Sequence, residues 1–120
     1  MRILVTGSEG TLGWQLCEAL EARGHDVLRV DLQHSRHANS VRADVANYRQ
    51  LSAAFESFDP DVVYHLAAEF GRLNGEGWYE QLWMTNAVGT RNILELCYVH
   101  NAQLVFAHQV RSTAMPRMIS

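Results

Sequence analysis

Three glycines, each three positions after the last, are the feature of this sequence most able to do chemistry. Gly7, Gly10 and Gly13 stand in "TGSEGTLG", directly after a short apolar run and where a helical pattern begins. Glycine allows a tight turn and a close approach of the backbone to another group. The first amides of a helix carry partial positive charge and bind phosphate. We therefore expect Gly7, Gly10, Thr11, Leu12 and Gly13 to form a phosphate-binding loop; the alternative is an ordinary turn between a strand and a helix.

An acidic residue at the end of the next apolar run supports a dinucleotide as the ligand. Asp31 stands there, followed by Leu32. A carboxylate in this place can accept both hydroxyls of an adenosine ribose and repels a 2′-phosphate, which favours NAD over NADP. Arg36 and Arg42 are the competing feature, because an arginine could pair with a 2′-phosphate. Glycines alone are a weak signal, but glycines between a strand and a helix with a downstream acid are a strong one.

The elements that must position these residues follow from hydrophobic periodicity. We expect helices over residues 11–23, 48–58 and 78–100, and strands over residues 2–6, 25–31, 41–44, 61–66 and 103–107. Strands that alternate with helices predict right-handed crossovers and a mostly parallel sheet. The fold class is therefore α/β.

Composition excludes several classes of protein. The formal net charge of the 120 residues is −3, so there is no basic field for nucleic acid or an anionic membrane surface. No apolar run approaches the roughly 20 residues that cross a bilayer, and the N-terminus does not resemble a signal peptide. Cys17 and Cys97 fall in predicted helices, where they are expected as buried free thiols. We expect a single cytoplasmic domain without a metal site.

Four motifs in order carry a resemblance to a known family. They are "TGSEGTLG" at 6–13, "ADV" at 43–45, "DVVYHLAAE" at 61–69 and "TNAVGTRNILELC" at 85–97. Together they resemble the NAD-dependent epimerase/dehydratase family, the extended short-chain dehydrogenase/reductases that act on sugar nucleotides. The resemblance covers about residues 1–107. It implies the N-terminal part of a Rossmann doubly wound parallel sheet with strand order 3-2-1-4-5.

The resemblance also assigns cofactor contacts beyond the glycine loop. It implies that Asp44 accepts from the adenine amino group while Val45 packs on the ring; the alternative for Asp44 is an ordinary strand-end aspartate. It implies that the backbone of Leu66, Ala67 and Ala68 runs beside the cofactor. Asn86 would fix a loop near the nicotinamide or, alternatively, cap a helix. We interpret His65, at the end of the fourth predicted strand, as a structural imidazole.

The catalytic groups of the family are missing from these residues. Hydride transfer in the family needs a Tyr-x-x-x-Lys pair and a Ser or Thr after the fifth strand, but all ten basic residues here are arginine. We therefore expect residues 1–107 to be a partial NAD(P)-binding Rossmann domain with no catalytic residue. In intact relatives the resemblance implies a nucleotide-sugar substrate and allows a homodimer.

The last residues, 108–120, differ in character from the rest. No acid follows Glu95, although acids are frequent before it. Permissible codons for "STAMPRMI" at 112–119, shifted by two nucleotides, read Tyr-Gly-Asp-Ala-Glu-Asp-Asp-Ile, which restores text typical of the family. One interpretation is a slipped reading frame near His108; the other is a genuine short protein with a divergent tail.

Three functions remain open at this point. The first is the cofactor-binding portion of a truncated epimerase/dehydratase, inactive alone. The second is a non-catalytic NAD(P)-binding module that regulates or joins a partner. The third is a non-functional remnant that folds poorly, because unpaired strand edges and uncovered apolar faces favour aggregation.

Overall fold

A computed structural model describes residues 1–67 and 83–106 of the 120-residue chain. Its five strands form one parallel sheet in the order β3-β2-β1-β4-β5, which confirms the expected topology. The strands are β1 (Arg2–Thr6), β2 (Asp26–Asp31), β3 (Ser40–Arg42), β4 (Val62–His65) and β5 (Gln103–Phe106). The helices are α1 (Thr11–Ala22), α2 (Tyr48–Phe58), the π-helix η1 (Met84–Val88) and α4 (Gly89–His100).

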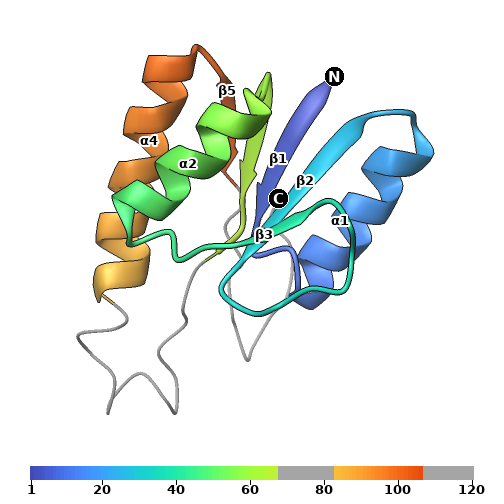
Figure 1. Ribbon diagram of the computed structural model, residues 1–120, viewed down its shortest axis with the longest axis horizontal. Helices are drawn as coiled ribbons and strands as arrows, with labels where there is room; N and C mark the ends of the chain where they lie inside the picture. The colour runs from blue at the N-terminus through green and yellow to red at the C-terminus, as the bar shows by residue number, and fades with distance from the viewer. Residues whose placement is uncertain (68–82, 107–120) are drawn as a thin grey trace, which may run out of the picture.

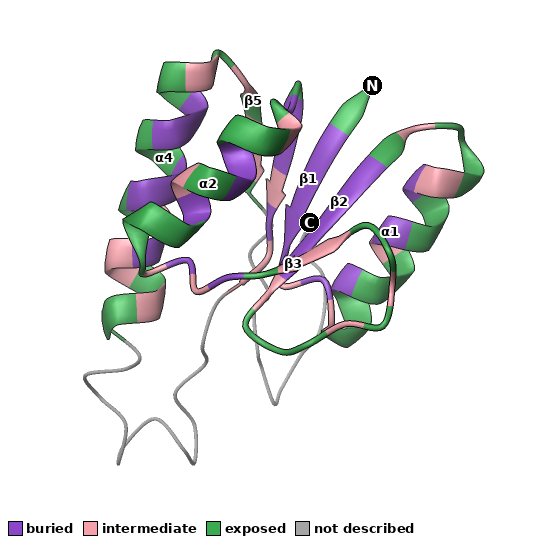
Figure 2. Ribbon diagram, viewed as in Figure 1, coloured by how far each residue is buried: buried purple, intermediate pink, exposed green. Residues whose placement is uncertain are grey.

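The helices form two layers around the sheet. Helix α1 lies on one face, and α2 and α4 lie together on the other (Figure 1). The central strands β1 and β2 are buried along most of their length because both faces are covered (Figure 2). Such three-layer packing is the doubly wound arrangement expected from alternating strands and helices.

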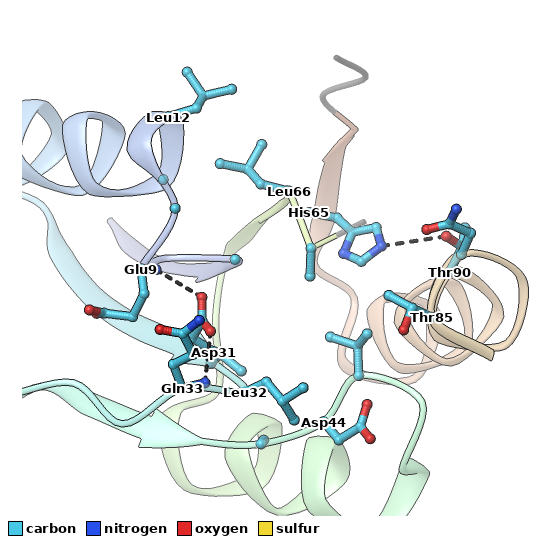
Figure 3. Close-up of a pocket in the computed structure, with 18 of the residues that line it drawn as sticks. Glu9, Leu12, Asp31, Leu32, Gln33, Asp44, His65, Leu66, Thr85 and Thr90 are labelled. Carbon is cyan, nitrogen blue, oxygen red and sulfur yellow. Dashed lines mark hydrogen bonds between the residues drawn. The ribbon is translucent and has the colours of Figure 1, made fainter. Parts of the chain in front are cut away.

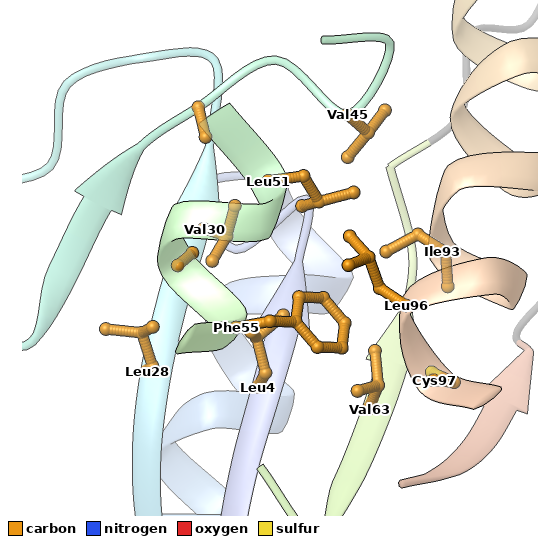
Figure 4. Close-up of a cluster of buried hydrophobic side chains, with 12 residues drawn as sticks. Leu4, Leu28, Val30, Val45, Leu51, Phe55, Val63, Ile93, Leu96 and Cys97 are labelled. Carbon is orange, nitrogen blue, oxygen red and sulfur yellow. The ribbon is translucent and has the colours of Figure 1, made fainter. Parts of the chain in front are cut away.

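Each face of the sheet has its own apolar core. On the α1 side, Cys17 and Leu20 pack on the apolar side chains of β1, β2 and β4. On the other side, Leu51 and Phe55 of α2 meet Ile93 and Leu96 of α4 over the sheet (Figure 4). Cys97 belongs to this second core, and both cysteines are free and buried, as expected. Since adjacent strand residues point to opposite faces, one strand contributes to both cores.

Local capping explains why helix α2 has the bounds that were expected. The side chain of Asn47 accepts a hydrogen bond from the amide of Gln50 at 3.1 Å, which satisfies one of the open amides at the start of the helix. At the other end Asp59 takes a left-handed conformation with φ 52°, and its amide closes the last turn on the carbonyl of Phe55.

Helix α1 and strand β2 are each one residue shorter than expected, and β4 is shorter by one residue at both ends; two elements differ more. Strand β3 covers Ser40–Arg42 rather than 41–44, because the Asp44 side chain accepts from the amide of Ala46 at 3.0 Å and turns the chain toward α2. The helix expected over 78–100 begins, in the described part, with the π-helix η1 before α4. Residues 78–82 of the expected helix and the tail at 108–120, to which the interpretation of a slipped reading frame applies, lie outside the described residues. No helix in the described ranges is long and apolar enough to cross a membrane.

Candidate functional site

The carboxyl ends of the strands open onto a cavity of about 930 Å³. The start of α1 forms one wall, and η1 with the start of α4 forms the opposite wall (Figure 3). The strand order reverses between β1 and β4, and ligands of open α/β sheets bind at this place. Every site residue expected from the sequence that the structure describes lines this cavity: Gly7, Gly10, Thr11, Leu12, Gly13, Asp31, Leu32, Asp44, Val45, Leu66, Ala67 and Asn86. Ala68 lies outside the described residues.

The glycines of the loop after β1 differ in the space around them. Gly7 has φ 71°, and a Cβ there would lie 2.9 Å from the amide nitrogen of Ala67. A Cβ at Gly13 would lie 2.1 Å from the carbonyl oxygen of Gly7. A Cβ at Gly10 would meet only that same oxygen, at 3.5 Å. The fold itself therefore requires glycine at positions 7 and 13, whereas position 10 has open space in front of it.

The start of α1 presents free donors to the cavity. Gly10 is the N-cap residue, no side chain among residues 1–67 and 83–106 caps the helix, and no acid stands in its first turn. The carbonyl of Gly10 accepts from the amide of Trp14 at 2.8 Å, so the helical ladder begins there. The amides of the intervening residues 11–13 have no helical acceptor. They form a site for an anion at the positive end of the helix dipole.

Asp31 is held beside this loop by two backbone amides. Its Oδ2 accepts from the amide of Glu9 at 2.8 Å and its Oδ1 accepts from the amide of Gln33 at 2.8 Å (Figure 3). A carboxylate oxygen can accept about two hydrogen bonds, so each oxygen retains one acceptor site. The carboxylate is therefore fixed at the cavity wall and still able to accept from ligand hydroxyls.

A second carboxylate near Asp31 had not been predicted. Glu9 lines the cavity, and its Oε2 is buried with no hydrogen-bond partner among the described residues. The two arginines that compete with Asp31 in the sequence are not among the lining residues: Arg36 is exposed, and the Nε of Arg42 donates to the carbonyl of Leu32 at 3.0 Å. Negative charge therefore predominates at this end of the cavity.

The "ADV" segment is anchored to both neighbouring helices. The amide of Asp44 donates to the Gln50 side chain at 2.9 Å. Val45 is only 5% exposed and belongs to the core, and its carbonyl accepts from the Asn92 side chain at 2.9 Å. A Cβ at Gly89 would lie 2.6 Å from a methyl group of Val45, so α4 packs tightly on this segment. The contacts of Asp44 and Val45 with an adenine stay predictions.

The end of β4 places a buried imidazole at the cavity. His65 is 3% exposed, and burial lowers its pKa to about 4. Its Nδ1 lies 2.8 Å from the hydroxyl of Thr6 and its Nε2 lies 3.4 Å from the hydroxyl of Thr90. The imidazole is thus neutral and hydrogen-bonded, as the structural interpretation requires, but it also lines the cavity. Asn86 stands within η1 rather than at the start of a helix, which disfavours a capping role.

The other lining residues lie inside the quoted motifs or close to them along the chain and the sheet. They stand at or just after the carboxyl ends of strands or in the first two turns of helices, a positional signal that could have identified several of them: Gln15, Val30, Gln33, Ala43, Thr85, Thr90 and Phe106. Among the described residues no group of three or more histidine, cysteine or acidic side chains is placed to hold a metal ion.

Comparison with known proteins identifies the family. The model of the "NAD dependent epimerase/dehydratase family" matches residues 3–115. A 2-alkyl-3-oxoalkanoate reductase of Stenotrophomonas maltophilia is 33% identical over 83% of this chain and 30% of the relative. A probable dTDP-glucose 4,6-dehydratase of Sinorhizobium fredii is 34% identical over 79% of this chain and 31% of the relative.

Solved structures agree with these relatives. The NAD complex of UDP-glucose 4-epimerase from Thermus thermophilus superposes with a TM-score of 0.81 at 30% identity, over 88% of this chain and 37% of that one. The chain thus spans about a third of the length of the relatives it matches. The glycine loop, the acid at the end of β2 and the strand order agree with the matched family: the chain belongs to the NAD-dependent epimerase/dehydratase family.

Proposed function

We propose that the chain binds NAD in the cavity at the carboxyl end of the sheet. The diphosphate lies against the amides of residues 11–13, and the adenosine ribose lies against Asp31. The observation that carries this proposal is the single cavity wall on which the uncapped start of α1 and the carboxylate of Asp31 meet. A helix start without a side-chain cap is open to phosphate.

The cavity fits the cofactor in size, and its glycine loop leaves the backbone open to a diphosphate. A volume of about 930 Å³ is at the upper end of the range for small-molecule pockets, as a dinucleotide requires. The open space at Gly10 lets a diphosphate approach the backbone without displacing a side chain. Bound NAD supplies a hydride acceptor, and the residues described here bind and orient it.

The cavity favours NAD over NADP. Asp31 and Glu9 both line it, and a 2′-phosphate on the adenosine ribose would be repelled by them. Neither Arg36 nor Arg42 is among the described lining residues. The preference for NAD therefore rests on two carboxylates. Two amides hold that of Asp31, and that of Glu9 has a buried oxygen with no partner in the described part of the chain.

The proposed function of these 120 residues is cofactor binding without turnover. The sequence has no lysine, so it holds no Tyr-x-x-x-Lys pair for proton transfer. A nucleotide sugar is the substrate class we propose for the reaction that this cofactor would serve, because two of the relatives are a dTDP-glucose dehydratase and a UDP-glucose epimerase. A cytoplasmic location stays part of the proposal, since both cysteines are buried free thiols.

Calorimetric titration of the purified chain with NAD and with NADP tests the binding. We expect NAD to bind more tightly than NADP. Replacing Asp31 with Asn removes a charged acceptor of the ribose hydroxyls. We expect this variant to bind NAD about tenfold or more weakly and to discriminate less between NAD and NADP. Asp26→Asn is the matched control, because Asp26 stands at the other end of the same strand and pairs with Arg2.

The outcomes separate the remaining functions. Saturable NAD binding without turnover of dTDP-glucose or UDP-glucose agrees with the proposal. A folded chain that binds neither dinucleotide contradicts it, and a chain that aggregates without binding indicates a remnant. Turnover of either sugar nucleotide by these residues alone contradicts the absence of catalysis.

A further inference from the structure

A chain of hydrogen bonds with a fixed direction starts at the end of β1. The Oγ1 of Thr6 accepts from the amide of Leu66 at 2.9 Å and from the amide of Ala67 at 3.1 Å. A hydroxyl has two acceptor lone pairs and one proton to donate. Both acceptor sites are therefore occupied, and the proton of Thr6 is left for its third neighbour, the Nδ1 of His65 at 2.8 Å.

This arrangement determines which nitrogen of His65 carries the proton. Because Thr6 donates to Nδ1, that nitrogen is an acceptor and has no proton of its own. A neutral imidazole has one proton, so it stands on Nε2. The ring is 3% exposed, and the pKa of about 4 that burial gives it keeps it neutral near pH 7.

The chain of hydrogen bonds continues from His65 to Thr90, on the cavity wall formed by η1 and the start of α4. The Nε2 of His65 points toward the Oγ1 of Thr90, 3.4 Å away (Figure 3). Since this nitrogen is a donor, the Thr90 oxygen is its acceptor, and the Thr90 proton remains available to a further acceptor. Thr90 is half-buried and lines the cavity at the start of α4. The chain that begins at two backbone amides thus ends in a hydroxyl donor at the cavity wall.

We propose that Thr90 contacts the ligand by donating a hydrogen bond to an acceptor oxygen of the bound dinucleotide, with His65 as the positioning residue that sets the direction of the donor. This inference rests on the proposed binding of NAD. The acceptor belongs either to the ADP part or to the nicotinamide riboside part of the dinucleotide. The competing acceptor within the protein is the backbone carbonyl one turn earlier in the helix, to which threonine hydroxyls commonly donate.

Thr90→Val tests the contact, because valine has nearly the same shape without the hydroxyl. We expect calorimetry to show about three- to tenfold weaker binding of NAD, the effect of one lost hydrogen bond. Thr90→Ser restores the hydroxyl and should return most of the affinity. Weakening of both NAD and ADP binding assigns the acceptor to the ADP part, and weakening of NAD binding alone assigns it to the nicotinamide riboside part.

Two results overturn the inference. Wild-type affinity for NAD in Thr90→Val shows that the hydroxyl donates to the helix backbone instead, while the proposed NAD binding stands. Failure of the wild-type chain to bind NAD overturns both proposals together. Nitrogen-15 NMR of the histidine ring tests the direction separately in the free protein: we expect a proton on Nε2 of His65, and a proton on Nδ1 would contradict the chain of donors.

Discussion

The glycines of the loop after β1 have separable roles, and single methyl groups can distinguish them. At Gly13 an added Cβ would meet the Gly7 carbonyl oxygen at 2.1 Å, a distance that only a backbone shift could relieve. At Gly10, φ −76° and ψ 167° suit any residue, and an added Cβ has an ordinary contact at 3.5 Å. Position 13 therefore serves the fold, and we propose that position 10 serves the ligand.

Gly10→Ala and Gly13→Ala form a matched pair of variants. We expect Gly13→Ala to lower the free energy of unfolding by about 2–3 kcal/mol, the usual effect of overpacking. Gly10→Ala should change it by less than about 1 kcal/mol, yet weaken NAD binding about tenfold, because its methyl group occupies the space of the diphosphate. Urea denaturation and calorimetry measure the two effects. Full NAD affinity in a folded Gly10→Ala variant would contradict the placement of the diphosphate.

His65 adds a pH dependence to stability whose sign follows from its burial. Its pKa is lowered from 6.5 to about 4 in the folded protein, so the unfolded chain binds the proton more readily. Stability from this residue is complete above pH 6.5 and is lost as the pH falls toward 4. A shift of this size corresponds to about 3 kcal/mol.

Replacing His65 with Gln should remove this loss of stability. The amide can accept from Thr6 and donate to Thr90 but does not titrate. We expect urea denaturation between pH 4 and pH 7 to show a shallower decline for His65→Gln than for the wild type. His34→Gln, in an exposed loop, is the control and should decline as the wild type does. Equal slopes in all three proteins would show that His65 takes up no proton on unfolding in this range.

The sequence predicted the positions of residues that belong to one continuous motif. It did not predict contacts that depend on how three separate elements pack together. The glycine loop and Asp31 line the cavity as expected, because a strand, a turn and a helix follow one another in the sequence. The contacts of His65 depend on the parallel register that pairs it with Thr6 and on the packing of α4. The spacing of residues in the sequence does not indicate which residues of β1 and β4 are paired. The chain of hydrogen bonds from Thr6 through His65 to Thr90 was therefore not predicted.

At the scale of elements, a partly buried ion pair joins α1 to β2. Both terminal nitrogens of Arg29 reach the carboxylate of Glu21, at 2.8 Å and 3.1 Å. The Arg29 side chain is 1% exposed while that of Glu21 is 31% exposed. The hydrogen bond from Arg29 holds the pKa of Glu21 below its ordinary value. The pair therefore holds α1 against β2. If its partner were lost, the Glu21 carboxylate could be hydrated by water, whereas the buried Arg29 guanidinium could not be hydrated as easily.

Neutralising Glu21 should lower the free energy of unfolding more than neutralising Arg29 does. Glu21→Gln leaves a buried guanidinium without its counter-charge and should cost about 2–4 kcal/mol. Arg29→Met leaves a carboxylate that can turn to water and fills the buried space, so we expect a loss of about 1 kcal/mol or less. Chemical denaturation of both variants measures the difference. A larger loss for Arg29→Met would show that the contact of the Arg29 guanidinium with the Trp14 ring, and not the counter-charge of Glu21, stabilises this corner.

Element bounds were predictable where side chains mark them. Helix α2 has an N-cap in Asn47 and a left-handed residue in Asp59, and its expected bounds are the observed ones. The π-helix η1 was not expected, because an apolar helical pattern does not distinguish a π-turn from an α-turn. Strand β3 ended early because Asp44 starts a turn, a side-chain contact that periodicity does not report.

For the whole molecule, the sheet order explains why one cavity collects residues that lie far apart in the sequence. Crossovers to opposite faces begin at β1, so the loops after β1 and β4 diverge and leave a crevice between them. The alternation of strands and helices predicted a mostly parallel sheet, and the resemblance to the family predicted this strand order. The sheet order does not predict the substrate. The relatives include a reductase, a dehydratase and an epimerase, and the chain spans only about a third of the length of each.

A crystal structure of the chain with NAD would test the central claim most directly. We predict diphosphate oxygens within hydrogen-bond distance of the amides of residues 11–13, and the hydroxyls of the adenosine ribose donating to Asp31. NAD bound elsewhere, or in the cavity with its diphosphate away from the start of α1, would contradict the account.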